Sequence, residues 1–273
     1  MELGDRTLVM GILNATLDSF SDGGQLATAE AAVAYGLGLY KAGADWVDVG
    51  AESTRPGAAR VDLEEEMRRI VPVVEGLRRG GAGPISVDTT RAEVARAALD
   101  AGADLVNDVS GFRFDPSMAA LVAERGVPAV LMHSRGRFEE LHRDPAYRDV
   151  AREVVAELGE TVARAESAGV PRERLIIDPG IGFAKDAAHS LEALGRLRAL
   201  EALDRPVLVG PSRKSFIGKV LDAPVGRRLM GTAAAVAAAV MLGAHVVRVH
   251  DVGEMVEVVR VCDAILEAGA PVR

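Results

Sequence analysis

The chain has 273 residues, 49% of them hydrophobic, and a formal net charge of −8 at pH 7. This length and apolar content supply a substantial core and exclude a disordered chain. The negative charge argues against general attraction to nucleic acid or an anionic membrane, so an anionic ligand requires a local basic cluster. The single cysteine, Cys262, cannot build a disulfide framework or a cysteine-based zinc site.

The N-terminal sequence predicts a cytoplasmic protein, because Met1 leads directly into strand-like residues without the pattern of an export signal. One apolar stretch, residues 229–247, is rich in Ala and Gly and is interrupted by Gly243. We interpret it as a buried helix followed by a strand, because Ala and Gly insert weakly into membranes and Gly commonly ends a helix. No membrane partner and no nucleic-acid partner are expected.

The predicted elements alternate between strand and helix along the whole chain. The first strand ends in the long polar loop NATLDSFSDGG, and the segments KAGADWVDVG, DAGADLVNDVSG and MLGAHVVRVHDV repeat one pattern, in which a helix closes with Gly-Ala and a Val-rich strand follows. The predicted strands cover residues 8–14, 45–51, 84–89, 104–110, 128–133, 174–179, 206–211 and 245–250. Segments of helical length between them include residues 27–42, 63–79, 91–101, 145–168 and 187–203.

This alternation predicts an α/β fold with a parallel sheet and right-handed crossovers. Eight such units in one chain favour a closed (β/α)8 TIM barrel, a single domain over residues 1–273. A doubly wound open sheet is the alternative, but the first strand–helix loop lacks the G-x-G-x-x-G sequence of nucleotide-binding sheets.

Polar residues stand at the carboxyl end of every predicted strand, which is the face where barrel enzymes build their sites. In chain order they are Asn14, then Glu52, Ser53, Thr54 and Arg55, then Asp88, Asn107 and Asp108, His133, Asp178, then Ser212, Arg213 and Lys214, and finally Arg248 and His250. The chain has only two Asn, and both belong to this set.

Each of these residues also has a purely structural interpretation. Asp88 could cap the helix near Arg91, and Asp178 could set a turn before a proline. His133 could be a hydrogen-bonded histidine at the barrel mouth, and Arg248 could be a buried ion-pair partner. Polar residues at all eight strand ends nevertheless favour a ligand site, because barrel interiors are normally filled with branched apolar side chains.

The chemistry of this set is limited. No Ser-His-Asp arrangement, nucleophilic Cys or His-x-x-x-His pattern is present. Carboxylates and amides suit a flat heterocycle with N–H donors and a carbonyl, while Arg can stack on a ring and bind phosphate. Composition and position together predict a nitrogen heterocycle carrying phosphate or carboxylate.

Seven segments in order resemble the dihydropteroate synthases of folate biosynthesis. They are MGILNATLDSFSDGG, GADWVDVGAESTRPGA, ISVDT, NDVSG, DPGIGFAK, LVGPSRKSFIG and RVHDV, and they extend from the first strand to the last. The resemblance implies a Mg²⁺-dependent transferase, a homodimer, that condenses 6-hydroxymethyl-7,8-dihydropterin diphosphate with 4-aminobenzoate and releases diphosphate.

The resemblance also implies roles for individual residues. The pterin would be bound by Asp88, Asn107, Met132, Asp178, Phe183, Lys214 and Arg248. The diphosphate would be bound by Asn14, Thr54, Arg55, Arg248 and His250, with Asn14 also holding the metal. The aminobenzoate would be bound by Phe20, Arg55, Pro56, Phe183 and Ser215. The catalytic group would be Asp22, Arg55, Lys214 and Arg248.

The polar first loop then has a function. Loss of diphosphate leaves a cation conjugated with the pterin ring, and Asp22 could stabilise that charge while Phe20 excludes water. Three residues depart from the family pattern: Leu17, Ala51 and Ser134. Two rival functions remain, a folate-dependent methyltransferase of the corrinoid type and a non-catalytic pterin-binding barrel. The segments STRPG and SRKSFIG, which would serve aminobenzoate and diphosphate, disfavour the methyltransferase.

Overall fold

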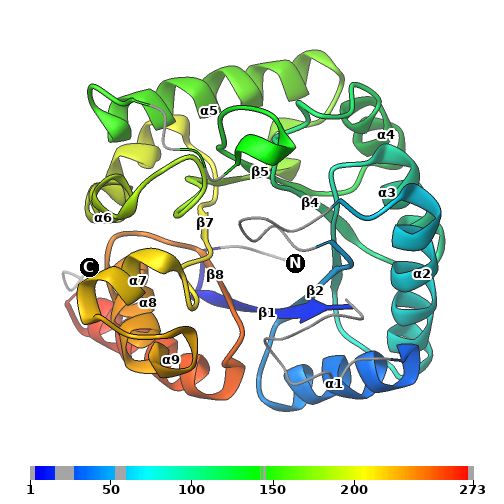
Figure 1. Cartoon of the computed structure of the whole chain (residues 1–273), viewed down its shortest axis with the longest axis horizontal. Coiled ribbons are helices and arrows are strands. Elements are labelled where there is room, and N and C mark those ends of the chain that lie inside the picture. Colours follow the sequence, from blue (N-terminus) through cyan, green and yellow to red (C-terminus); the bar gives the residue numbers. More distant parts are fainter. Residues whose placement is uncertain (1–3, 16–27, 53–59, 142, 144–145, 270–273) are drawn as a thin grey trace.

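Eight parallel strands form the wall of a barrel in the computed structural model of the chain, with helices arranged around them (Figure 1). The structure describes residues 4–15, 28–52, 60–141, 143 and 146–269. The strands are β1 (Leu8–Asn14), β2 (Trp46–Gly50), β3 (Ile85–Asp88), β4 (Leu105–Asp108), β5 (Ala129–Met132), β6 (Leu175–Asp178), β7 (Leu208–Val209) and β8 (Val246–Val249). The eight strands predicted from the sequence are therefore confirmed; β1 has the predicted bounds, and the other seven are shorter.

The sheet closes on itself. The hydrogen-bonded order is β6-β5-β4-β3-β2-β1-β8-β7, and β6 meets β7 through a parallel bridge between Ile177 and Val207. At this junction the backbone N–H of Ile177 donates to the carbonyl oxygen of Pro206 at 2.9 Å. The open doubly wound sheet is thus excluded, and the (β/α)8 barrel is confirmed.

The helices of the described residues cover the outside of the barrel (Figure 1). They are α1 (Ala29–Lys41), α2 (Leu63–Arg79), α3 (Ala92–Asp100), α4 (Met118–Arg125), α5 (Val150–Ser167), α6 (Ala187–Gly195), α7 (Ser215–Leu221), α8 (Leu229–Met241) and α9 (Val252–Gly269). The apolar stretch at 229–247 is a helix followed by a strand, as predicted. In the described part of the chain, no helix is both long enough and apolar enough to cross a membrane.

Two predicted helices differ from the structure. The segment 187–203 is α6 followed by the 3₁₀ helix η3 (Leu197–Leu203), because Gly195, a weak helix former, ends α6. The predicted helix 145–168 is described from residue 146, and α5 begins only at Val150, where the Asp149 carboxylate accepts a hydrogen bond from the N–H of Arg152 at 3.0 Å. The eight-residue α4 was not among the predicted helices.

The barrel interior is divided into an apolar floor and a polar mouth. The floor consists of Leu8, Met10, Trp46, Leu105, Val130, Ile176, Leu208 and Val246, all buried. Side chains on one face of a strand recur every second residue, so the next inward position on each strand lies nearer the carboxyl end. The pairs of floor and mouth residues are Trp46 and Asp48, Leu105 and Asn107, Val130 and Met132, Ile176 and Asp178, and Val246 and Arg248. On four of these strands the side chain changes from apolar to polar towards the carboxyl end, and on β5 it stays apolar, which makes the mouth the candidate ligand site.

Candidate active site

The mouth of the barrel is organised around the guanidinium group of Arg248. Its Nε donates to Oδ2 of Asp48 at 2.6 Å, and one terminal nitrogen donates to Oδ2 of Asp88 at 2.8 Å. Asn107 donates from Nδ2 to the same Asp48 oxygen at 2.9 Å. Two predicted ligand residues, Asn107 on β4 and Arg248 on β8, are therefore joined through one carboxylate on β2, and Arg248 also binds the third, Asp88 on β3.

Asp48 was not predicted as a site residue. The predicted residues stand at strand ends, whereas Asp48 lies in the middle of β2 and is fully buried. The signal was nevertheless present, since a carboxylate at an inward strand position is costly unless it is paired.

The structural interpretation is wrong for Asp88 and confirmed for Arg248. Asp88 does not cap α3, because the N–H of Ala92 at its start donates to the carboxylate of Asp115 at 2.7 Å. Arg248 does form buried ion pairs, as its structural interpretation predicted. Burial raises the pKa of Asp88, although Arg248 opposes the rise. Whether Asp88 carries a proton therefore depends on whether Arg248 stays paired with it.

Asp178 and Lys214 lie on the opposite side of the mouth. Asp178 Oδ1 accepts a hydrogen bond from the N–H of Gly180 at 2.7 Å, so its predicted turn role is confirmed. Burial raises the pKa of Asp178, and Lys214 opposes the rise. Burial lowers the pKa of Lys214 to about 8, and Asp178 opposes that fall. The two groups thus supply an acceptor and a cation in a poorly solvated place.

An apolar wall borders this polar pair. Met132 packs with Val109 and Leu141, and the partly buried ring of Phe183 lies against that cluster. The ammonium group of Lys214 lies over the Phe183 ring, 4.4 Å from its centroid, and donates to the carbonyl oxygen of Ile181. A flat ring entering the mouth would meet apolar surface beside hydrogen-bonding edges, as small-ligand sites require.

A buried hydrogen-bonded chain supports the loop after β6. Lys185 Nζ lies 2.9 Å from His133 Nδ1 and donates to the carbonyl oxygens of Gly180 at 3.2 Å and Phe183 at 3.1 Å. His133 Nε2 contacts Glu157 at 3.0 Å. Burial lowers the pKa of His133 to about 4, so the ring is neutral, donates from Nε2 to Glu157 and accepts at Nδ1.

His133 is therefore a hydrogen-bonded histidine of the barrel mouth, as its structural interpretation predicted. Lys185 is one of only four lysines in the chain and stands in the predicted loop after β6. Glu157, the partner of His133, comes from α5, and the helical pattern of α5 gives no sign of such a contact.

The segment that follows β8 is hydrogen-bonded to the segment that follows β7. His250 Nδ1 lies 2.9 Å from Ser212 Oγ, and that oxygen also accepts from the backbone N–H of His250 at 3.2 Å. Arg213 is paired with Asp251, its Nε donating at 3.1 Å. Ser215 begins α7 and is exposed. His250 and Ser215 therefore stand at the rim, where predicted ligand contacts are possible without rearranging the strands.

Asn14 is the single predicted metal ligand. It ends β1 in register with Gly50, which is in register with Asp88 on its other side. A Cβ at position 50 would lie 3.2 Å from the Asp88 Cβ, so glycine keeps the space between these neighbours open. Among the described residues no group of three or more His, Cys, Asp or Glu could hold a metal. One amide oxygen fits Mg²⁺, which usually takes few protein ligands and completes its shell with water and phosphate.

Some predicted residues lie outside the described residues. They are Phe20 and Asp22 of the first loop and Thr54, Arg55 and Pro56 of the second, together with the departing residue Leu17. Of the other two departures, Ala51 is fully buried, and Ser134 Oγ donates to the carbonyl oxygen of Val109 at 2.9 Å. Neither displaces a predicted ligand contact.

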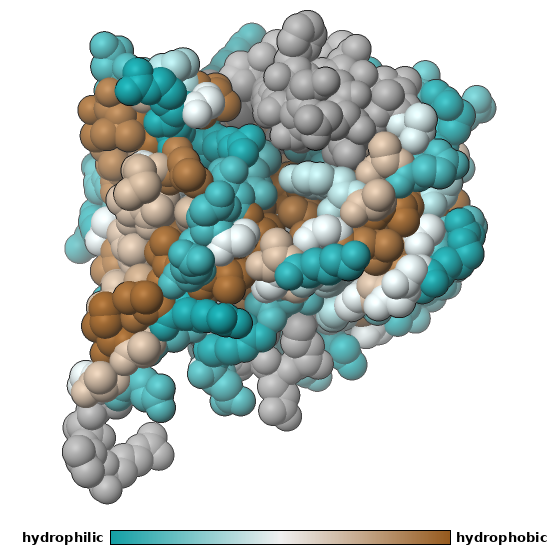
Figure 2. Space-filling view, turned by 90° about the horizontal axis from the view of Figure 1, so that it is seen from below, coloured by the Kyte–Doolittle hydropathy of each residue, from teal (hydrophilic) through white to brown (hydrophobic). Residues whose placement is uncertain are grey.

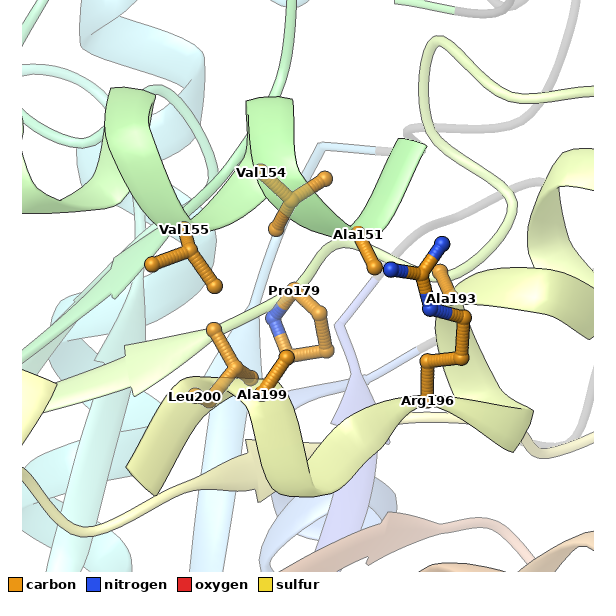
Figure 3. Close-up of a pocket in the computed structure, with 8 residues that line it drawn as sticks. All are labelled: Ala151, Val154, Val155, Pro179, Ala193, Arg196, Ala199 and Leu200. Atoms are coloured by element: carbon orange, nitrogen blue, oxygen red, sulfur yellow. The ribbon is translucent and has the colours of Figure 1, made fainter. Parts of the chain in front are cut away.

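A separate hollow lies behind the barrel wall, between α5, α6 and η3 (Figure 3). Figure 3 shows Val154 and Val155 on one side of Pro179, with Ala193, Ala199 and Leu200 across from them. Its volume of about 10 Å³ admits at most a single water, so this hollow is not the substrate site.

The chain belongs to the pterin binding enzyme family, whose model matches residues 10–250. Among curated relatives, the dihydropteroate synthase of Synechocystis sp. is 47% identical over 263 residues, which cover 96% of this chain and 91% of the relative.

Solved structures agree over almost the full length. The Xanthomonas albilineans dihydropteroate synthase with 4-aminobenzoic acid superimposes with a TM-score of 0.90 at 47% identity, covering 98% of this chain and 95% of that one. The same organism's enzyme in complex with 7,8-dihydropteroate gives a TM-score of 0.87 at 44% identity, with the same coverage.

Proposed function

We propose that this chain is a dihydropteroate synthase, which joins 6-hydroxymethyl-7,8-dihydropterin diphosphate to 4-aminobenzoate with release of diphosphate. One observation carries the proposal. The inward strand positions of the mouth hold Asp88, Asn107, Asp178 and Arg248, with Lys214 beside them, in a chain that matches such enzymes over nearly its full length.

The chemistry of the mouth suits a pterin. Its amino-pyrimidinone edge offers several N–H donors and one carbonyl. Asp88 and Asp178 are acceptors, whereas Asn107 and Lys214 can donate. Met132 and Phe183 supply apolar contact beside these groups. A buried site that pairs every donor and acceptor of a ring rejects rings with a different pattern, because mismatched polar groups would lose their hydrogen bonds.

The reaction exchanges one bond for another. The amine nitrogen of 4-aminobenzoate forms a bond to the exocyclic methylene carbon of the pterin, and the bond from that carbon to the diphosphate oxygen breaks. The electron pair leaves with diphosphate, and the amine proton passes to solvent. A neutral arylamine is already nucleophilic, so the chain's task is to orient the two substrates and stabilise the charges that develop.

Arg248 and His250 would bind the departing diphosphate, and Asn14 would hold Mg²⁺ together with the diphosphate oxygens. When bound, the ion neutralises charge on the leaving group. Asp22, Arg55 and Thr54, with Phe20 and Pro56, would complete the site from the first two loops, and Ser215 would meet the aminobenzoate carboxylate.

Diphosphate release tests the function directly. The purified chain, given the pterin diphosphate and Mg²⁺, should release diphosphate when 4-aminobenzoate is added and much more slowly without it. Chelation of the metal should slow the release. Binding of the pterin diphosphate with no aminobenzoate-dependent release would instead favour a non-catalytic pterin-binding barrel, and methyl transfer from a folate would favour the corrinoid-type alternative.

We further propose that the chain forms a homodimer through α7 and the start of α8. Val220 and Leu221 of α7 are 61% and 49% exposed, and Met230 of α8 is 77% exposed. Gly231 lies against Ile217 and Leu221, which brings the two helices together. Figure 2 shows apolar surface gathered along the edge of the molecule that carries α7, α8 and α9 in Figure 1. A cytoplasmic location stays a prediction.

A further inference from the structure

We propose that Asp48 is a positioning residue that keeps Arg248 and Asn107 in place while Arg248 exchanges Asp88 for the diphosphate of the substrate. The inference rests on the proposed function. The observation behind it is a single carboxylate oxygen, Asp48 Oδ2, which accepts from Arg248 Nε at 2.6 Å and from Asn107 Nδ2 at 2.9 Å.

The two carboxylates that bind Arg248 differ in their surroundings. Asp48 is fully buried, and its second oxygen, Oδ1, has no hydrogen-bond partner among the described residues. Asp88, at the carboxyl end of β3, retains a side-chain exposure of 15%. Asp88 is therefore open to a ligand in the mouth, whereas Asp48 can contact only protein groups.

The two contacts also use different parts of the guanidinium group. Asp48 binds Nε, next to the side-chain stem, and Asp88 binds a terminal nitrogen. The guanidinium group is a rigid plane, so its nitrogens move together. A small pivot of that plane about the Asp48–Nε hydrogen bond, taken up by the aliphatic torsions of the side chain, shifts the terminal nitrogens while the Nε contact persists. The geometry thus provides a fixed end and a movable end on one side chain.

Substrate binding makes use of this difference. The donors of a pterin ring compete with Arg248 for the oxygens of Asp88. The released terminal nitrogens can then bind diphosphate, which Arg prefers for its fork-like geometry. Without Asp48, a buried guanidinium would have no fixed counter-ion during this exchange, and its position would be poorly defined.

The neighbour of Asp48 provides a control. Ser86 is its register partner on β3, is equally buried, and has a hydroxyl group with no hydrogen-bond partner among the described residues. Ser86→Ala therefore alters the same layer of the barrel without touching Arg248 or Asn107.

The experiment compares Asp48→Asn, Ser86→Ala, Arg248→Ala and the double variant Asp48→Asn/Arg248→Ala. Affinity for inorganic diphosphate in the presence of Mg²⁺ is measured by titration calorimetry, and steady-state kinetics are measured for both substrates. Asp48→Asn should weaken diphosphate binding at least about tenfold and raise KM for the pterin diphosphate, while KM for 4-aminobenzoate changes less than about twofold. Ser86→Ala should stay within about twofold of wild type in all three.

The double variant separates positioning from general structural damage. Because Asp48 acts on diphosphate through Arg248, the change Asp48→Asn should have no further effect on diphosphate affinity in the Arg248→Ala background. If Asp48→Asn alone does not fold, the double variant, in which neither partner charge is left buried and unpaired, still allows this comparison.

Two results would overturn the inference: wild-type diphosphate affinity in Asp48→Asn, or a further loss in the double variant relative to Arg248→Ala. The proposed function is judged separately on the wild-type chain. Aminobenzoate-dependent release of diphosphate by wild type, together with unchanged binding by Asp48→Asn, would leave the enzyme assignment intact and remove only the role of Asp48.

Discussion

Arg248 combines a structural role in the barrel interior with a side chain that is open to the mouth. Its ion pairs with Asp48 and Asp88 make it part of the barrel interior, yet its side chain remains 21% exposed at the mouth. A guanidinium group with two carboxylate partners can exchange one of them for a ligand and stay bound to the other. Its structural and ligand-binding interpretations are therefore compatible.

Arg248→Ala should lower kcat/KM for the pterin diphosphate by a factor equivalent to at least about 2 kcal/mol, because an anion contact and a surface for the ring disappear together. The control is Arg96→Ala, which removes an arginine–carboxylate pair to Glu124 on the exposed side of α3. A fall of less than about threefold for Arg248→Ala in steady-state kinetics would show that Arg248 does not bind the substrate.

Asp178→Asn should weaken pterin binding at least about fivefold and leave folding largely intact. The amide oxygen can still accept from the N–H of Gly180, so the turn is kept. The amide nitrogen, however, presents a donor where the ring needs a second acceptor. Calorimetry with a pterin monophosphate measures the loss of pterin binding, and thermal unfolding measures whether the fold is kept. Unfolding at room temperature would mean that Asp178 serves the turn alone.

The connection between β6 and α6 is the element on which the site most depends. It carries Asp178, packs Phe183 against the apolar wall, and is held from behind by Lys185. Two of its glycines, Gly180 and Gly182, have φ angles of +66° and +80°. The path of this loop is therefore fixed by backbone geometry and by one buried cation.

Lys185 should make stability depend on pH in a defined direction. Burial lowers its pKa from 10.5 to about 7. The folded chain must hold an unfavourable ammonium group below pH 7, and this cost disappears between pH 7 and 10.5 as the folded state, but not the unfolded state, releases the proton. Relative to Lys185→Met, the wild-type free energy of unfolding should thus rise by up to about 1.4 kcal/mol per pH unit above pH 7.

Denaturant unfolding of both proteins at several pH values from neutral to alkaline gives this difference, and groups common to both proteins cancel. A difference that stays constant with pH would mean that Lys185 keeps its ordinary pKa in the folded chain.

Gly180→Ala should destabilise the fold by about 3 kcal/mol or more. A Cβ at this position would lie 2.0 Å from the backbone oxygen of His133, which is itself fixed in the mouth. Gly182→Ala is the matched control, since it shares a positive φ angle but its Cβ would meet only the flexible side chain of Lys214 at 3.1 Å. Equal losses of unfolding free energy in the two variants would show that the φ angle, and not the collision, sets the cost.

At the scale of the whole molecule, the distribution of apolar surface predicts an assembly. The exposed apolar residues Val220 and Leu221 lie on α7 and Met230 lies on α8, and these two helices are neighbours. A patch of this kind is costly to leave in water and is typical of a protein interface. A second copy of the chain is its proposed partner.

Met230→Asp should shift the protein from dimer to monomer in sedimentation velocity experiments, because a charge would be buried without a partner at the interface. Ala156→Asp, at an exposed site on α5, is the control for adding one surface charge and should leave the mass unchanged. A wild-type chain that sediments as a monomer would contradict the proposal, as would an unaffected dimer in Met230→Asp.

Much of the fold could be predicted because its signals are local. Val-rich strands, helices that close with Gly-Ala, and polar residues at strand ends are each written within a few neighbouring residues, and together they indicate a closed barrel with its site at one mouth. The break after Gly195 and the late start of α5 were not predicted, because propensity specifies helix ends less well than helix interiors.

The sequence by itself determined which residues could form the site, since strand alternation and chain order bring Asp88, Asn107, Asp178 and Arg248 to one face of one sheet. The tertiary structure alone decided how they act on one another. Asp48 joins β2 to β4 and β8 across 59 and 200 positions of the chain, and Lys185 meets His133 across 52. Such contacts depend on barrel closure and on burial, which set the geometry and the pKa of each group. No local pattern of residues encodes barrel closure or burial.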